Sequence, residues 1–211
     1  MRLRSILASV VISSAVVGCA QPAEEAPEPI APALLGQILD DVPSDVPNKT
    51  FIDFDGKVVL VGYELEPSGT VRPGERFKLK LYWRSMAPLG KDWSLFTHLL
   101  TLGGQRVAGD FDNVGPLRDR ASGEQALPPS RWQPGRVYVD EQELMMPQGV
   151  QSPVVTVVVG IWKPGYRLNI LSGPADGERR AIIAHIPTGV EPVRPPVNPS
   201  GPSQPAAPAH P

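Results

Sequence analysis

Alternation of apolar and polar side chains is the clearest pattern in this chain, and it is strongest over residues 77–84. One side of the run carries Phe77, Leu79, Leu81 and Trp83, whereas Lys78, Lys80, Tyr82 and Arg84 occupy the other side. Successive side chains of a β-strand point to opposite faces of its sheet. The run therefore predicts a strand with one buried face and one solvated face, and it places Trp83 in the core.

A Pro-Gly pair precedes this strand and returns twice more in the chain. The three pairs are Pro73-Gly74, Pro134-Gly135 and Pro164-Gly165, and each lies beside a β-rich run. Proline sets the first central φ angle of a type II turn, and glycine accepts the positive φ angle that follows. The pairs predict tight corners at the ends of strands.

Further runs of β character are separated by turn signals. An Asp55-Gly56 hairpin signal joins residues 51–54 to a strand over residues 58–66. We expect other strands over 93–102, 105–110, 137–146, 154–162, 166–171 and 179–186, with 154–162 in a central position. No helical crossovers are present to support a parallel sheet. The pattern predicts an all-β chain folded as an immunoglobulin-like antiparallel β-sandwich of about seven or eight strands.

Proline marks the ends of this predicted domain. The chain has 26 prolines, and eight of them lie in the last 22 residues. Such segments bury too little apolar surface to offset the entropy of ordering. We therefore expect a signal peptide over residues 1–18, a Pro/Ala/Glu-rich tether over 19–47, the β-sandwich over 48–187 and a disordered tail over 188–211.

Two segments are ambiguous in this division. Leu34, Leu35, Ile38 and Leu39 could form two helical turns, which we interpret as a marginal helix rather than a partner-binding motif. A long stretch over residues 111–130 shows no periodicity. Loops of this length are often functional or mobile, and the sequence leaves both readings open.

The N-terminus carries an export signal. A basic start at Arg2 and Arg4 precedes an apolar run of about 12 residues, which is too short to span a bilayer but typical of a signal peptide. Residues 16–19 read Val-Val-Gly-Cys and resemble the bacterial lipobox, whose cysteine is lipidated. This resemblance predicts acylation of Cys19 and a membrane anchor in the cell envelope. Because Ala20 rather than aspartate follows, we favour the outer membrane; the alternative is an ordinary secretory signal.

Composition argues against several classes of function. A net charge of −2 without a basic block gives no support to nucleic-acid binding. One cysteine permits neither a disulfide framework nor a cysteine-based metal site. His98 and His185 lack metal-binding spacing, so we expect each to be hydrogen-bonded within or at the edge of a sheet. Residues 110–113, Asp-Phe-Asp-Asn, lack the ligand spacing of a calcium loop, and we expect no metal and no cofactor.

Carboxylates on a predicted strand raise the hypothesis of an envelope hydrolase. Asp140, Glu141 and Glu143 could provide a pair of acids for glycoside hydrolysis. Adjacent strand residues point in opposite directions, however, so we favour a solvated strand face. Ser130 has no Gly-x-Ser-x-Gly context, and no phosphate-binding loop is present. We therefore do not expect this protein to be an enzyme.

Aromatic residues beside the Pro-Gly corners suggest a binding surface. Tryptophan or tyrosine at a loop edge can stack on a sugar ring, and polar neighbours can bind its hydroxyl groups. The alternative is that these rings cap the ends of the sandwich. The candidate ligand-binding residues are Trp132, Trp162, Tyr166, Arg131, Asp112 and Asn113.

A family resemblance spans residues 51–186. The motifs that carry it are Phe54-Asp55-Gly56, Leu60-Val61-Gly62-Tyr63, Val71-Arg72-Pro73-Gly74, Leu79-Lys80-Leu81-Tyr82-Trp83, Phe96-Thr97-His98-Leu99-Leu100, Ser130-Arg131-Trp132-Gln133-Pro134-Gly135 and Val139-Asp140. This part of the chain resembles the soluble β-sandwich domain appended to some bacterial membrane glycosyltransferases of the protein-mannosyltransferase-like superfamily. The catalytic acids of those enzymes belong to a membrane part that has no counterpart here. The resemblance thus implies an accessory module and does not extend to glycosyl transfer.

Together these features predict a non-catalytic, lipid-anchored cell-envelope protein that presents an immunoglobulin-like binding or interaction module. Its expected partners are the membrane, through Cys19, and an envelope protein or glycan. The alternative is a carbohydrate-recognising accessory protein of envelope glycan assembly.

Overall fold

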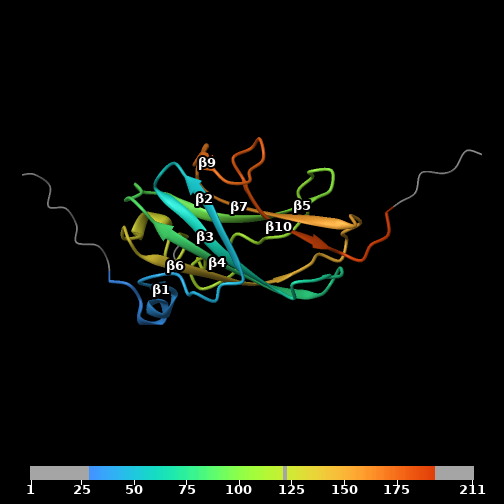
Figure 1. Cartoon of the computed structure of the whole chain (residues 1–211), viewed down its shortest axis with the longest axis horizontal. Helices are drawn as coiled ribbons and strands as arrows, with labels where there is room; N and C mark the ends of the chain where they lie inside the picture. The colour runs from blue at the N-terminus through green and yellow to red at the C-terminus, as the bar shows by residue number, and fades with distance from the viewer. Residues whose placement is uncertain (1–28, 121–122, 193–211) are drawn as a thin grey trace, which may run out of the picture.

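Two antiparallel β-sheets pack face to face in the computed structural model, which describes residues 29–120 and 123–192 (Figure 1). The first sheet has the strand order β1-β6-β4-β3-β2-β9, and the second has the order β10-β7-β5 with β8 paired to β7. The predicted all-β, immunoglobulin-like antiparallel sandwich is confirmed. The predicted signal peptide, Cys19 and most of the predicted tail lie outside the described residues.

Ten strands are present in this part of the chain, rather than seven or eight. They are β1 (Ile38–Leu39), β2 (Asn48–Phe54), β3 (Val58–Glu66), β4 (Arg76–Ser85), β5 (Ser94–Thr101), β6 (Val137–Met145), β7 (Val154–Lys163), β8 (Tyr166–Arg167), β9 (Ile170–Ser172) and β10 (Ala181–Pro187). Short 3-10 helices, η1 (Pro32–Gln37) and η2 (Pro129–Arg131), complete the elements. No helix within the described ranges is long and apolar enough to cross a membrane.

The predicted strand over residues 77–83 forms the middle of β4, which lies between β3 and β6. Its apolar side faces the second sheet, and Leu79, Leu81 and Trp83 are fully buried there. Strand β7 is central in the smaller sheet, as the sequence predicted. The glycines of all three Pro-Gly corners have positive φ angles of 77° to 86°. Alternation and corner chemistry are local properties, which is why they could be predicted.

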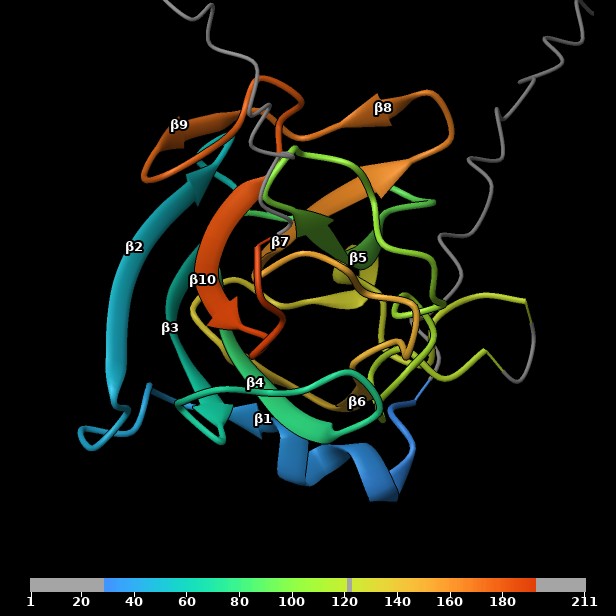
Figure 2. The same cartoon turned by 90° about the vertical axis from the view of Figure 1, so that its right-hand side faces the viewer.

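The predicted strand over residues 166–171 is wrong, because the chain changes sheets within it. Strand β8 pairs with β7 in one sheet, whereas β9 pairs with β2 in the other. Figure 2 shows both short strands at the same end of the sandwich. Between them, Asn169 donates its backbone N–H and its side-chain amide to the Asp55 carboxylate at 2.9 Å each. These hydrogen bonds to the β2–β3 turn fix the chain where it passes from the small sheet to the large sheet.

The predicted tether also needs correction, since residues 29–47 are part of the folded body. Leu34 is buried, and β1 pairs with the edge of β6 instead of continuing a helix. Beyond β1 the chain runs over the outer face of the large sheet. A second apolar cluster forms there from Leu39, Val42, Val46, Val61, Tyr82, Val137 and Val139.

The folded domain also extends beyond its predicted C-terminal boundary at residue 187. Thr188 is fully buried, its backbone N–H donates to the Pro153 carbonyl at 3.0 Å, and its hydroxyl donates to the Ser152 carbonyl. The fold therefore continues past Pro187.

The long segment over residues 102–128 is packed against the sandwich where it is described. Phe111, Leu117 and Leu127 are buried in the main core. The predicted hairpin arm over 105–110 is reduced to one isolated bridge between Leu100 and Arg106. Side chains of the segment replace a neighbouring strand along β5. Asp112 accepts from the backbone N–H of Thr97 at 2.9 Å, and Gln125 bonds both backbone groups of Leu95 at 2.8 and 3.0 Å.

This segment also overturns the predicted environment of Asp140. Asp140 is fully buried instead of lying on a solvated face, and Arg118 holds it through a two-pronged ion pair with N–O distances of 2.7 to 3.0 Å. The partner is 22 residues away in the sequence and comes from a segment without periodicity. No strand pattern could have indicated it.

Candidate functional site

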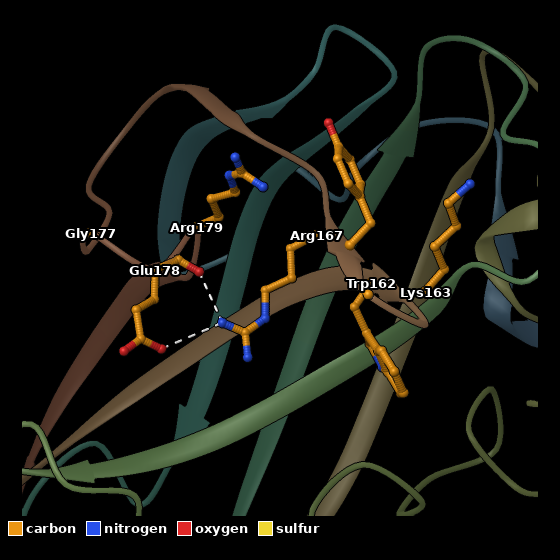
Figure 3. A pocket seen from close by; sticks show the side chains of 8 residues that line it. Trp162, Lys163, Arg167, Gly177, Glu178 and Arg179 are labelled. Atoms are coloured by element: carbon orange, nitrogen blue, oxygen red, sulfur yellow. Dashed lines mark hydrogen bonds and ion pairs between the residues drawn. The ribbon is translucent and has the colours of Figure 1, made fainter.

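A concave cleft of about 520 Å³ lies at the β7–β8 hairpin, where two stretches of chain face each other (Figure 3). Hairpin residues form one wall, and the turn before β10 forms the opposite wall. We define the β7–β8 cleft by its lining residues Trp162, Lys163, Gly165, Tyr166, Arg167, Gly177, Glu178 and Arg179.

Strand alternation and the Pro-Gly corner place these side chains. Ile161 points into the core, so Trp162 points to the outer face of the small sheet, and Lys163 leaves β7 on the other side (Figure 3). Pro164-Gly165 then reverses the chain in two residues, so that Tyr166 pairs with Lys163 and Arg167 pairs with Trp162. The hairpin therefore pairs one aromatic residue with one cation on each of its two sides, Tyr166 with Lys163 and Trp162 with Arg167.

Three cations of the cleft lie over aromatic rings. The Lys163 ammonium is 4.9 Å from the centre of the Trp93 ring, and the Arg167 guanidinium is 5.2 Å from that of Phe96. Arg179 lies over Tyr166 at 5.5 Å. A ring attracts a cation through its electron-rich face but accepts few of its N–H bonds. These contacts therefore position the cations without saturating their donors.

Ion pairs brace the turn that presents Arg179. Arg167 Nη1 donates to the Glu178 carbonyl at 3.0 Å and lies 3.6 Å from Glu178 Oε2 (Figure 3). Asp176 accepts from the backbone N–H groups of Glu178 and Arg180 at 2.8 and 3.2 Å. Within this turn Arg179 has a φ angle of 58°, in the left-handed region that non-glycine residues rarely adopt. The turn holds Arg179 in an otherwise unfavourable backbone conformation.

A second hollow of about 190 Å³ adjoins the cleft, because both are lined by Trp162 and Arg167. Phe96, His98, Arg106 and Asp112 complete its lining. The Asp112 carboxylate lies 3.6 Å from Arg106 Nη2 and 3.9 Å from His98 Nε2. Burial is the main cause that lowers the pKa of His98 to about 4, and the cationic Arg106 nearby lowers it further. At neutral pH the imidazole in this hollow is uncharged.

The structure brings together three of the six predicted ligand-binding residues. Trp162 and Tyr166 line the β7–β8 cleft, and Asp112 lies in the adjoining hollow. Tyr166 is 45% exposed, so its ring is accessible. Asn113 lines neither hollow, and its side-chain amide donates to Asp110 at 2.7 Å.

The other two predicted residues lie at η2 and do not contribute to the cleft. Trp132 is buried, stacks on Tyr138 with ring centres 4.6 Å apart, and donates its indole N–H to the Leu127 carbonyl at 3.0 Å. Its ring closes the core, as the alternative interpretation held, and cannot stack on a sugar in this position. Arg131 and the edge of Trp132 line a separate hollow with Pro29 and Ile30, and Arg131 donates to the Pro29 carbonyl at 3.4 Å.

Sequence reasoning missed Lys163, Arg167 and Arg179. A usable signal existed for the first two, because they flank the aromatic residue of a Pro-Gly corner. Arg179 gave no such signal, since only the folding of the β9–β10 turn brings it to Tyr166.

Residues considered for metal binding or hydrolysis have other partners. Asp110 accepts hydrogen bonds from Asp112 and Asn113 within its own turn. Asp140 is bound by Arg118, and Glu143 pairs with Arg76 at 3.1 Å on the outer face of the large sheet. Across residues 29–120 and 123–192, no cluster of three or more His, Cys, Asp or Glu side chains could hold a metal ion.

The sequence predicted that His98 and His185 are each hydrogen-bonded within or at the edge of a sheet, and the structure confirms this for one of them. His185 Nδ1 lies 3.0 Å from the Thr156 hydroxyl within the sheet. His98 Nδ1 is buried without a hydrogen-bond partner, so the expectation for His98 is wrong.

No protein-family model matches this chain, and no curated protein matches it.

Proposed function

We propose that this chain is a non-catalytic, lipid-anchored protein of the cell envelope whose β-sandwich presents a binding module. Anchoring is supported by the export signal and by the position of Cys19 after Val-Val-Gly. The binding role is supported by one observation: the β7–β8 hairpin and the β9–β10 turn gather Trp162, Tyr166 and three cations around one concave cleft. The resemblance to domains appended to membrane glycosyltransferases supports an accessory role in the same compartment.

Carbohydrate is the ligand class that the cleft favours. Sugar rings bind to exposed aromatic faces while arginine and lysine donate to their oxygen atoms. The cleft offers Tyr166, 45% exposed, next to the donors of Lys163 and Arg179. This supports the alternative of a carbohydrate-recognising accessory protein in envelope glycan assembly.

Cell fractionation tests the anchor. Wild-type protein should sediment with membranes and incorporate a labelled fatty acid, whereas Cys19→Ser protein should do neither. Several acyl chains give stable anchoring because each buried methylene contributes about 0.8 kcal/mol. Equal sedimentation of both proteins, with no label in either, would refute lipidation at Cys19.

A glycan array probed with the full chain tests the cleft. We expect binding to at least one glycan class and a loss of about tenfold in affinity for Tyr166→Ala, since an aromatic contact contributes about 0.5–1.5 kcal/mol beyond its buried area. The matched control is Phe51→Ala, which removes an exposed aromatic side chain from β2 on the other sheet. Silence of the array, or equal losses in both variants, would reject the carbohydrate site.

A further inference from the structure

The β7–β8 cleft is a positively charged site on an acidic chain. Lys163, Arg167 and Arg179 face a single carboxylate, Glu178, whereas the whole chain has a net charge of −2. A hollow lined mainly by one sign of charge attracts ligands of the opposite sign.

Two of the three cations have no counter-ion among the residues that the structure describes. Arg167 contacts Glu178, which Arg180 also approaches to 3.4 Å. In contrast, no carboxylate of the described residues lies within ion-pair distance of Lys163 or Arg179, and each is held over an aromatic ring instead. Their N–H donors are available to a ligand. A guanidinium matches a carboxylate or phosphate group with two parallel hydrogen bonds, which is the strongest arrangement such donors can make.

We propose that the β7–β8 cleft binds an anionic sugar, an oligosaccharide that carries a carboxylate or phosphate group. Arg179 and Lys163 pair with the anionic group, and the exposed ring of Tyr166 contacts the sugar. This inference rests on the proposed binding function of the cleft and specifies its ligand class.

The shape of the site favours a sugar over an anionic membrane surface. Electrostatic binding to lipid headgroups usually needs a cluster of four to eight lysine or arginine residues. Here three cations surround a hollow of about 520 Å³, a volume typical of small-ligand sites.

Calorimetric titration of the full-length chain with a matched pair of ligands tests the proposal. The pair is trigalacturonate and its fully methyl-esterified form, which differ in charge but share the same sugar rings. We expect the acid to bind at least about tenfold more tightly, because only the acid can form charge-assisted hydrogen bonds with the arginine and lysine side chains of the cleft. Mannose 6-phosphate against mannose forms a second pair that separates phosphate from carboxylate recognition.

Substitutions in the cleft test whether the preference for the acidic ligand arises from Arg179 and Lys163. Arg179→Gln and Lys163→Gln should each weaken binding of the acidic ligand about fivefold to tenfold and weaken binding of the neutral ligand by clearly less, because glutamine keeps an N–H donor but carries no charge. The matched control is Arg76→Gln, which removes an exposed arginine from the outer face of the large sheet. It should leave both affinities unchanged.

The outcomes separate this inference from the proposed function. Equal affinity for the charged and neutral members of both pairs would overturn the anionic class but leave a carbohydrate-binding cleft. If neither pair binds, the anionic class fails, whereas the carbohydrate candidate fails only if the glycan array is silent as well. Binding to phosphatidylglycerol vesicles that depends on Arg179, without binding of any sugar, would overturn the proposal in favour of a membrane surface.

Discussion

Packing sets the charge of His98. Phe96 lies beside its imidazole with ring centres 4.8 Å apart, and Arg106, Arg167 and Arg180 add positive potential, opposed by Asp112. Strand alternation places Phe96 on the same face as His98. It indicates none of the charged neighbours, which come from the loop after β5, from β8 and from the β9–β10 turn. The local pattern therefore located His98 in a sheet but could not predict its state.

The lowered pKa of His98 predicts a pH dependence of stability. Its pKa in the folded chain is about 4, below the ordinary 6.5, so the unfolded chain takes up a proton first as the pH falls. His98 should thus reduce the free energy of unfolding progressively between pH 6.5 and pH 4, by about 1–3 kcal/mol. Urea denaturation across this range should show a smaller pH dependence for His98→Phe. Identical pH profiles for the two proteins would contradict the assignment.

At the scale of elements, the segment between β5 and η2 is structural where it is described. The sequence left open whether residues 111–130 were functional or mobile, because they lack periodicity. In the structure they supply core side chains, replace a strand beside β5 and bury Arg118 against Asp140 of β6. Gly115 allows this approach, since a Cβ atom there would lie 2.2 Å from the Glu141 carbonyl oxygen. Tertiary contacts decided the role of a segment whose sequence predicts only a loop.

Breaking the Arg118–Asp140 pair should destabilise the fold. Asp140→Asn leaves a buried guanidinium without its counter-ion, which typically costs about 3–5 kcal/mol. Replacing both residues together, as Arg118→Met with Asp140→Leu, should cost less than the single change because no charge stays buried. The matched control, Glu143→Gln, removes an exposed ion pair and should cost less than about 1 kcal/mol. Chemical denaturation measures all three, and a control loss as large as that of Asp140→Asn would contradict the assignment.

At the scale of the whole molecule, the domain is larger than its strand pattern indicates. The segment over residues 29–47 looks like a tether because it belongs to a longer stretch, residues 21–47, that is rich in proline, alanine and glutamate. It nevertheless pairs with β6 and covers Val137, Val139 and Tyr82 on the outer face of the large sheet. Arg136 and Arg84 bind Asp40 and Asp41 within the same segment. A proline-rich composition disfavours helices and central strands, but it does not prevent a segment from packing onto a surface formed elsewhere.

Truncation tests this boundary. Relative to a variant that starts at Pro29, one that starts at Asn48 loses the cover over this apolar face. We expect a loss of about 3–6 kcal/mol, since burial of a leucine or valine side chain contributes about 1.5–3 kcal/mol and both Leu34 and Val46 are removed. Thermal denaturation and light scattering should show a lower Tm and aggregation. Equal Tm values would mean that residues 29–47 act as a tether after all.

The sequence by itself determined the strands of the sandwich and its three Pro-Gly corners, because alternation and φ preferences act over a few residues. It also carries the motif from which lipidation of Cys19 is predicted. Only the tertiary structure decided which aromatic residues are accessible: Trp132 and Trp162 flank similar corners, yet the first is buried in the core and the second lies partly exposed in the β7–β8 cleft. The cleft itself combines a hairpin with a distant turn, and burial and charge at such a junction depend on contacts that no local pattern specifies.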